Sequence, residues 1–279
     1  MDEQTVKILC ELNKEFYQEH AESFSATRQS PWSGWLKALE ATSLCRRHFS
    51  PEPRRSATLG SDDKHHLRDL RPPEPSVLTI FDLACGNLRF ASFLQETLPD
   101  ASIEYYAIDN CDALVPSAPA INYQSLDVLK LLQQNERIND YLKAPLCDLS
   151  VAFGFMHHVP TQTYRAAVLD ALIAQTHPGG YIIVSFWQFM KNEALAAKAR
   201  ITHERALQER GLPELDEGDY LLDWQNRADT YRYCHSFSEA EMDALLHGVA
   251  GRAKTVARFT ADGRTGDLNT YVILQTASV

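Results

Sequence analysis

The sequence lacks any long apolar run. No stretch approaches the roughly 20 residues that a membrane-spanning helix requires. The amino-terminal segment MDEQTVKILCELNKEF is too acidic and too polar for a secretory signal peptide. We therefore expect a protein that does not enter a membrane and that is located in the cytoplasm.

Cysteine pairs of the metal-binding kind are also lacking. The six cysteines, at positions 10, 45, 85, 111, 147 and 234, form no CxxC pair and have no histidine companion at zinc spacing. They are typical of buried, reduced thiols in a cytoplasmic protein, so we expect neither disulfides nor a bound metal.

Positive charge is scarce. The 279 residues include 27 Lys and Arg against 37 Asp and Glu, which gives a formal net charge of −10 at pH 7. A free-standing RNA-binding protein usually presents a basic face. The chain therefore has a small local basic surface, or borrows one from a partner, or does not bind RNA.

Three regions can be distinguished along the chain. Residues 1–45 predict an N-terminal helical cap, with two helices around the aromatic-rich turn Phe24–Trp35. Residues 46–76 carry five prolines and little periodicity, which indicates a flexible insertion. This insertion is either a solvated loop or, because of its slight basic excess, an arm that touches nucleic acid. Residues 77–279 form the main domain.

From residue 77 onward, predicted strands and helices alternate, which indicates an α/β fold with a mostly parallel sheet. Strands are expected near 77–83, 103–108, 121–125, 147–153 and 180–187, and helices near 88–98, 127–142, 162–176 and 189–210. The segment Glu214–Phe237 is predicted to be irregular. A helix near 238–248 has Ser238 as its N-cap and Glu241 in the capping-box position.

Two final strands, near 253–260 and 268–275, form a hairpin that adds to five parallel strands. Doubly wound dehydrogenases usually lack such a hairpin. This ending predicts the seven-stranded, Rossmann-like plan of the class I S-adenosylmethionine (SAM) methyltransferases.

The segment LTIFDLACGNLRF, residues 78–90, combines a strand, a turn of small residues and the start of a helix. Small residues let the backbone approach a ligand, and the helix start offers unpaired N–H groups. A dinucleotide fingerprint needs glycines where this chain has Ala84 and Leu88, which disfavours NAD. A second strand, YYAID, ends in Asp109, where a carboxylate can accept both hydroxyls of a ribose. Two acids at successive strand ends favour SAM as the cofactor.

The expected cofactor-binding residues are Asp82, Ala84, Gly86, Asp109, Asp127 and Phe155. In this interpretation Asp82 orients the loop and faces the methionine ammonium group of SAM. Asp127 is placed either to accept a hydrogen bond from the adenine amino group or to cap the following helix. Asp109 has the alternative role of an ordinary loop acid, and Ala84 and Gly86 that of a tight turn between strand and helix.

The segment FGFMHHVP follows the fourth strand, and ligands of open parallel sheets bind outside the carboxyl ends of the strands. Residues of this segment are therefore expected beside the methyl group that SAM transfers. His157 and His158 are candidates for a general base or for a substrate clamp. Either histidine could instead be a structural residue.

Several segments resemble, in order, one known family. They are FSATRQSPWSGW, DLACGNLRF, VAFGFMHHVPTQTYRAAVLDALIAQTHPGGYIIVSFW, GDYLLDW and YRYCHSFSEAEMDALL. The chain is similar over nearly its whole length, except 46–76, to the tRNA wobble-uridine carboxymethyl methyltransferases, which include the methyltransferase domain of the AlkB-like tRNA enzymes. The resemblance implies O-methylation of a carboxymethyl group on tRNA, and it suggests a small zinc-binding activator protein as a partner.

The resemblance also implies roles for individual residues. A carboxylate acceptor needs a fixed cation, for which Arg28 and Arg165 are candidates. Arg28 is expected to be catalytic and Arg165 to bind the substrate. Trp32, Trp35 and Trp224 could stack on a base or ring of the substrate, or they could pack in the core. The alternative function is methylation of a small-molecule acid, phenol or natural product. If the acceptor is a hydroxyl or an amine, His157 or His158 would serve as the base.

Overall fold

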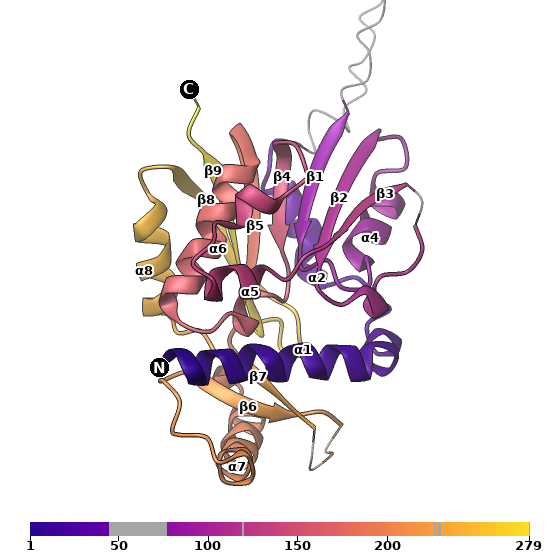
Figure 1. The fold of residues 1–279 in the computed structure, drawn as a ribbon. Coiled ribbons are helices and arrows are strands. Elements are labelled where there is room, and N and C mark those ends of the chain that lie inside the picture. The colour runs from indigo at the N-terminus through magenta and orange to yellow at the C-terminus, as the bar shows by residue number, and fades with distance from the viewer. Residues whose placement is uncertain (45–76, 119, 226, 228–229, 279) are drawn as a thin grey trace, which may run out of the picture.

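The computed structural model describes residues 1–44, 77–118, 120–225, 227 and 230–278 (Figure 1). The insertion expected over residues 46–76 lies outside the described residues. Among those that are described, no helix combines the length and the apolar character needed to cross a membrane.

The centre of the molecule is a seven-stranded sheet with the order β3-β2-β1-β4-β5-β9-β8. The first five strands in this order are parallel, and β9 runs antiparallel to both β5 and β8. The strands are β1 (Leu78–Leu83), β2 (Ile103–Asp109), β3 (Ile121–Ser125), β4 (Cys147–Ala152), β5 (Thr176–Trp187), β8 (Ala253–Ala261) and β9 (Asn269–Thr276). The predicted seven-stranded, mostly parallel sheet with a C-terminal antiparallel pair is therefore confirmed.

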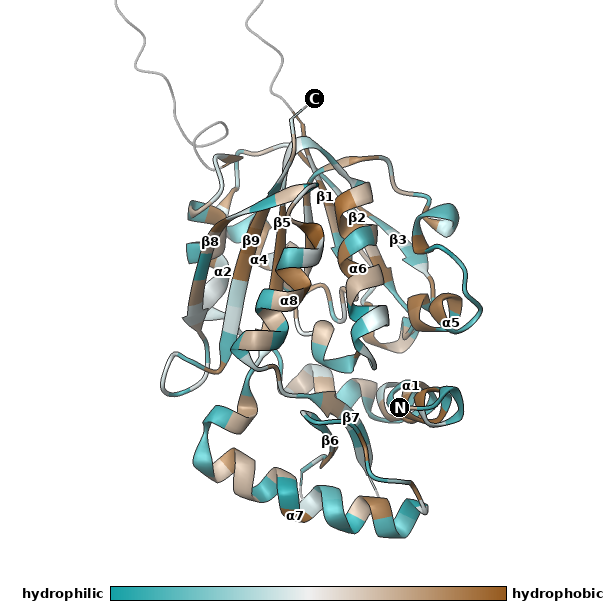
Figure 2. Cartoon of the chain, turned by 90° about the vertical axis from the view of Figure 1, so that its left-hand side faces the viewer, coloured by the Kyte–Doolittle hydropathy of each residue, from teal (hydrophilic) through white to brown (hydrophobic). Residues whose placement is uncertain are grey.

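Helices cover both faces of this sheet. One face carries α5 (Val128–Gln133), α6 (Gln162–Gln175) and α8 (Glu239–Val249), and the other carries α2 (Ser33–Glu40) and α4 (Arg89–Thr97). In Figure 2 the central strand β5 is coloured as hydrophobic, whereas the edge strand β8 is largely hydrophilic. This difference follows from position, because a central parallel strand is buried on both faces.

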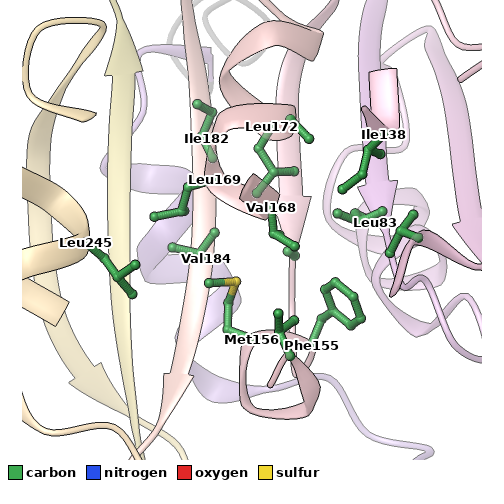
Figure 3. Packing of buried hydrophobic residues seen from close by; sticks show 14 of the residues in the cluster. Leu83, Ile138, Phe155, Met156, Val168, Leu169, Leu172, Ile182, Val184 and Leu245 are labelled. Carbon is green, nitrogen blue, oxygen red and sulfur yellow. The ribbon is translucent and has the colours of Figure 1, made fainter. Parts of the chain in front are cut away.

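The core on the α6 face is built from aliphatic side chains of neighbouring elements (Figure 3). Val168, Leu169 and Leu172 of α6 pack against Ile182 and Val184 of β5, and all five are fully buried. Full burial of one such side chain contributes about 1.5–3 kcal/mol. On the other face, Gly34 lets α2 approach the sheet, because a Cβ at this position would collide with the ring of Tyr271.

A smaller unit lies at the edge of the sheet where the parallel strands end. Helix α1 (Glu3–Ala26) crosses this edge, and β6 (Asp219–Asp223), β7 (Tyr231–His235) and α7 (Glu193–Arg210) lie beyond it (Figure 1). One side of α1 contributes to the core of the sheet, and the other side packs with the β6–β7 hairpin and α7. The side chain of Asn13 pairs with the backbone of Tyr233, accepting from its N–H at 2.7 Å and donating to its carbonyl at 3.1 Å.

Three expectations about single elements have clear outcomes. The prediction that Glu214–Phe237 is irregular is wrong, since β6 and β7 form an antiparallel hairpin there. The helix expected over 127–142 is too long, because α5 ends at Gln133 and Asn135 takes a left-handed φ of 57°. The capping box of α8, with Ser238 as N-cap and Glu241, is confirmed.

Candidate functional site

Two adjoining cavities lie between the carboxyl ends of the parallel strands and α1. The inner cavity, of about 120 Å³, is lined among others by Asn13, Tyr17, Gly86, Asp109, Asp127 and Phe155. The outer cavity, of about 560 Å³, is lined among others by Arg28, Trp32, Asp82, His157, Trp187 and Arg232. This edge is where open parallel sheets bind their ligands.

The loop after β1 forms the floor that the two cavities share. Ala84, Gly86 and Leu88 all adopt left-handed conformations, with φ values of 61°, 54° and 58°. Such a conformation suits glycine and costs other residues of order 1 kcal/mol. The fold holds the loop in place by pairing it with the next strand: the Gly86 N–H donates to Asp109 Oδ2 at 2.8 Å.

Asp82 lies at the end of β1, is 2% exposed and lines the outer cavity. The hydroxyl of Tyr105 donates to its Oδ2 at 2.5 Å. Burial raises the pKa of Asp82 to about 7, against the smaller opposing effect of the Tyr105 hydrogen bond. A cation bound beside this carboxylate would favour its ionised form.

The predicted cofactor acids Asp109 and Asp127 both line the inner cavity. The second oxygen of Asp109 accepts from the Cys111 N–H at 2.9 Å, so backbone donors orient both of its oxygens. Asp127 caps α5 by accepting from the Lys130 N–H at 3.0 Å. The N-cap alternative for Asp127 is therefore confirmed, and its contact with the adenine amino group stays a prediction. Phe155 is buried and lines the same cavity.

Two arginines flank one tryptophan beside the outer cavity. The guanidinium carbons of Arg28 and Arg232 lie 5.7 and 5.4 Å from the centre of the Trp224 ring. Within the described residues, neither arginine forms an ion pair with a carboxylate, although Asp223 and Tyr17 act electrostatically on Arg232. Burial, together with repulsion from Arg232, lowers the pKa of Arg28. The pair is therefore a positively charged region that an anionic ligand would stabilise.

Unsatisfied nitrogen atoms gather around the outer cavity. Among the described residues, four cavity-lining side chains have a buried nitrogen without a hydrogen-bond partner: Trp35 Nε1, Arg89 Nε, His157 Nδ1 and Arg232 Nε. Three of these are obligate donors. Buried donors without partners are rare in folded proteins, so this arrangement favours a ligand rich in acceptor oxygens.

The two adjacent histidines have different environments. His157 lines the outer cavity, and its ring centre lies 5.0 Å from that of Trp187. His158 lines the inner cavity, where it can donate from Nδ1 to the Tyr233 carbonyl at 3.0 Å while the Tyr17 hydroxyl donates to Nε2 at 2.7 Å. Burial lowers the pKa of His158 to about 3, and it lowers that of His157 well below its usual range.

These environments correct the prediction for His158. Both of its ring nitrogens are engaged by the protein on the side of the inner cavity, so it is not placed to act as a base or clamp for an acceptor. His157 lines the outer cavity, where burial favours its neutral imidazole form.

The structure also corrects the predictions for Arg165 and Trp224. Arg165 is buried away from both cavities, where it donates to Asp219 at 3.2 Å, to the Tyr233 hydroxyl at 3.0 Å and to the Val159 carbonyl at 3.0 Å. Trp224 is not among the described lining residues, and its ring packs against the two arginines instead of being open for stacking.

Trp32 lines the outer cavity, and its predicted stacking on a substrate stays a prediction. Its ring stacks on that of Trp35 at 5.6 Å, and its Cζ–Cη edge reaches the left-handed Gly154, where a Cβ would lie 3.0 Å from Trp32 Cη2. Sequence reasoning missed Arg232 and Trp187. The only signal for Arg232 was a charged residue within the apolar segment YRYCHSF.

One group of potential metal ligands occurs among the described residues. Ligand atoms of His157, His158 and Cys234 lie within 4.8 Å of one another. His158 is already hydrogen-bonded, burial raises the pKa of the Cys234 thiol to about 11, and the cation Arg232 lies nearby. These surroundings do not suit a divalent cation. The five described cysteines are buried and free, while Cys45 lies outside the described residues.

No family model matches this chain. A protein of Encephalitozoon cuniculi (strain GB-M1) named "Putative methyltransferase ECU09_1500" is 25% identical over 234 residues, which cover 83% of this chain and 81% of that protein. The tRNA (carboxymethyluridine(34)-5-O)-methyltransferase ALKBH8 of Macaca fascicularis is 22% identical over 190 residues, which cover 67% of this chain but only 21% of that protein.

Two solved structures share the fold over most of the chain. The DhpI–SAM–HEP complex covers 95% of this chain and 97% of its own, with 16% identity and a TM-score of 0.52. A SAM-dependent methyltransferase of Methanosarcina mazei covers 72% of this chain and 92% of its own, with 16% identity and a TM-score of 0.51. The chain therefore has the seven-stranded, Rossmann-like fold of SAM-dependent methyltransferases.

Proposed function

We propose that this protein is a SAM-dependent methyltransferase that transfers the methyl group to a carboxylate, the carboxymethyl group of a tRNA wobble uridine. Its fold and its distant relatives support methyl transfer from SAM. The observation that supports a carboxylate as the acceptor is a pair of arginines without acid partners at the outer cavity, Arg28 and Arg232.

The residues of the two cavities fit SAM. Asp109 and Asp127 supply acceptors in the inner cavity for the ribose hydroxyls and the adenine amino group. Asp82, at the neighbouring cavity wall, supplies a carboxylate for the methionine ammonium group. When bound, SAM supplies an activated methyl group on a sulfonium ion.

A carboxylate acceptor removes the need for a general base. Its solution pKa is near 4, so it is already ionised at pH 7. The protein must then hold the carboxylate in line with the methyl group and exclude water from it. Arg28 and Arg232 would hold the carboxylate, while the partly buried ring of Trp187 and the buried ring of Trp224 would exclude water around it. His157, which is neutral, would donate or accept a hydrogen bond without titrating.

The wobble uridine and the activator protein rest on resemblance. The ALKBH8 enzyme, whose name specifies carboxymethyluridine at position 34 of tRNA, matches across 67% of this chain. We accordingly extend the proposal to a small zinc-binding activator protein as a partner, and to action in the cytoplasm.

A second candidate acceptor is a small-molecule acid. The net charge of −10 favours it, because an acidic chain repels the phosphates of tRNA. The same two arginines would then bind the carboxylate of a free acid.

Mass spectrometry of tRNA nucleosides from cells that lack the gene tests the proposal. We expect the carboxymethyl uridine to accumulate and its methyl ester to disappear. Purified protein, with and without the activator, should restore the ester on that tRNA when SAM is added, and an Arg232→Met variant should not. An unchanged nucleoside profile would contradict the tRNA assignment.

A further inference from the structure

Arg89 is a third arginine at the outer cavity, at the start of α4 and directly after the loop that follows β1. Its guanidinium carbon lies 5.3 and 5.2 Å from the ring centres of Trp32 and Trp35. One of its terminal nitrogens donates to the Ser30 carbonyl at 3.0 Å, whereas its buried Nε has no partner among the described residues. The side chain is thus held in place while its buried Nε–H donor is unused.

Arg89 also lacks a neutralising carboxylate in the described part of the chain. The carboxylate of Asp262 acts on Arg89 electrostatically, but hydrogen bonds from other residues already engage it. Its two oxygens accept from Ser33 Oγ, the Gly34 N–H, Asn269 Nδ2 and the Tyr271 hydroxyl. Burial and repulsion from Arg28 lower the pKa of Arg89 to about 10, which still leaves it charged at pH 7. Arg89 is half-buried, and a partly desolvated charge without a counter-ion is stabilised by a ligand that supplies one.

A second unused donor lies beside Arg89. The indole Nε1 of Trp35 is buried, lines the same cavity and has no partner among the described residues. A guanidinium N–H and an indole N–H in one cavity are the complement of a group with two acceptor oxygens and a negative charge. A carboxylate has both properties.

The position of Arg89 distinguishes it from the proposed acceptor site. Arg28 and Arg232 flank Trp224, which belongs to the segment around the hairpin. Arg89 instead follows the Gly86–Asn87 turn and shares its cavity wall with Asp82, the carboxylate assigned to the methionine ammonium group. An amino acid carries its ammonium and carboxylate groups on the same carbon, so their partners must be close together.

We infer that Arg89 and Trp35 bind the α-carboxylate of the methionine part of SAM. This inference rests on the proposed function, in which SAM is the methyl donor. The three arginines of the outer cavity then have different ligands: Arg89 binds the cofactor, and Arg28 and Arg232 bind the acceptor.

Calorimetric binding of SAM and of decarboxylated SAM, which lacks this carboxylate, tests the inference without an activity measurement. Arg89→Met should weaken the binding of SAM at least about tenfold, the loss expected for a charge-assisted hydrogen bond, and change that of decarboxylated SAM less than about twofold. Arg89→Lys should restore part of the affinity for SAM. Trp35→Phe keeps an aromatic ring but removes the indole N–H. It should weaken the binding of SAM and leave the binding of decarboxylated SAM unchanged.

Arg28→Met is the matched control, and it should keep the affinity for SAM within about twofold of the unaltered protein. Equal losses for both ligands in Arg89→Met and in Trp35→Phe, or no loss in either, would overturn the inference. The inference would also be overturned if Arg28→Met, rather than Arg89→Met, lost the ability to bind SAM more tightly than decarboxylated SAM. If the unaltered protein does not bind SAM, the proposed function itself fails.

Discussion

The raised pKa of Asp82 predicts that the binding of SAM depends on pH. Its pKa of about 7 exceeds the ordinary value because the carboxyl group is buried, while the SAM ammonium and sulfonium charges favour its ionised form. Only about a tenth of the unliganded protein has Asp82 ionised at pH 6, so SAM affinity should rise about tenfold from pH 6 to pH 8. Calorimetry at both pH values checks this, and Asp82→Asn should remove the dependence. Equal affinities in the unaltered protein would contradict it.

The same shift has a consequence for stability. A raised pKa in the folded state means that Asp82 stabilises the unliganded protein below its unfolded pKa of about 3.8, and that this contribution is lost as the pH rises through about 7. In the proposed complex, SAM would supply the missing counter-charge. The increase in melting temperature on adding SAM should therefore be larger at pH 8 than at pH 6.

Asp109 should contribute more to SAM binding than a nearby acid that does not line a cavity. Each hydrogen bond to its charged carboxylate contributes about 1.5–3 kcal/mol. Asp109→Ala should therefore weaken SAM binding at least tenfold. Asp112→Ala is a matched control, because Asp112 follows the same strand but is exposed and bonds to Tyr123. Similar losses in the two variants would argue against Asp109 as the ribose ligand.

The residues proposed to bind the acceptor predict how the reaction rate depends on pH. With SAM saturating, kcat/KM for the acceptor should be flat from about pH 6 to 9, because the carboxylate is ionised and His157 stays neutral throughout. Arg28→Met and Arg232→Met should each raise the acceptor KM and lower kcat, and His157→Ala should cost less than either. A steep rise near pH 6.5–8 that disappears with His157→Ala would instead identify a hydroxyl or amine acceptor.

At the scale of elements, the sheet was predictable and the β6–β7 hairpin was not. The strands of the sheet are apolar runs bounded by turn residues, and such runs are recognisable in a single sequence. All five residues of β7 are buried, including Arg232 and His235, because α1 packs against this strand on one side. A strand that is buried on both faces does not need to alternate polar and apolar residues, so the sequence of this segment does not show the pattern that reveals a half-buried strand.

The same packing explains which site residues the sequence could indicate. Acids at strand ends are fixed by the parallel topology, so Asp82 and Asp109 reach the cavities as expected. The arginines depend on how α1 and the hairpin fold back over the sheet. For that reason Arg165 was mistaken for a substrate residue, while Arg232 was overlooked.

Arg165 should matter for the stability of the hairpin. It shares Asp219 with the Tyr233 hydroxyl and with His235, and all four side chains are buried. Arg165→Met leaves the Asp219 carboxylate without its cation, which should lower the free energy of unfolding by about 3–5 kcal/mol. Arg252→Met, which breaks the exposed pair with Asp170, should cost less than about 1 kcal/mol. Chemical denaturation of both variants measures the difference, and equal effects would show that the Asp219 network is not stabilising.

At the scale of the whole molecule, charge limits how the chain can meet tRNA. A net charge of −10 opposes the phosphate backbone, which normally supplies most of the affinity for nucleic acids. The chain alone should therefore bind tRNA no more tightly than non-specific complexes do, with a Kd of about 1–100 μM at physiological salt. A partner that adds its own contacts should tighten binding at least about tenfold. Fluorescence anisotropy with labelled tRNA, with and without the proposed zinc-binding activator, measures both values. The activator could leave the affinity for tRNA unchanged while the protein methylates a free carboxylic acid. In that case the small-molecule alternative replaces the tRNA assignment, and the proposed roles of Arg28 and Arg232 stay the same.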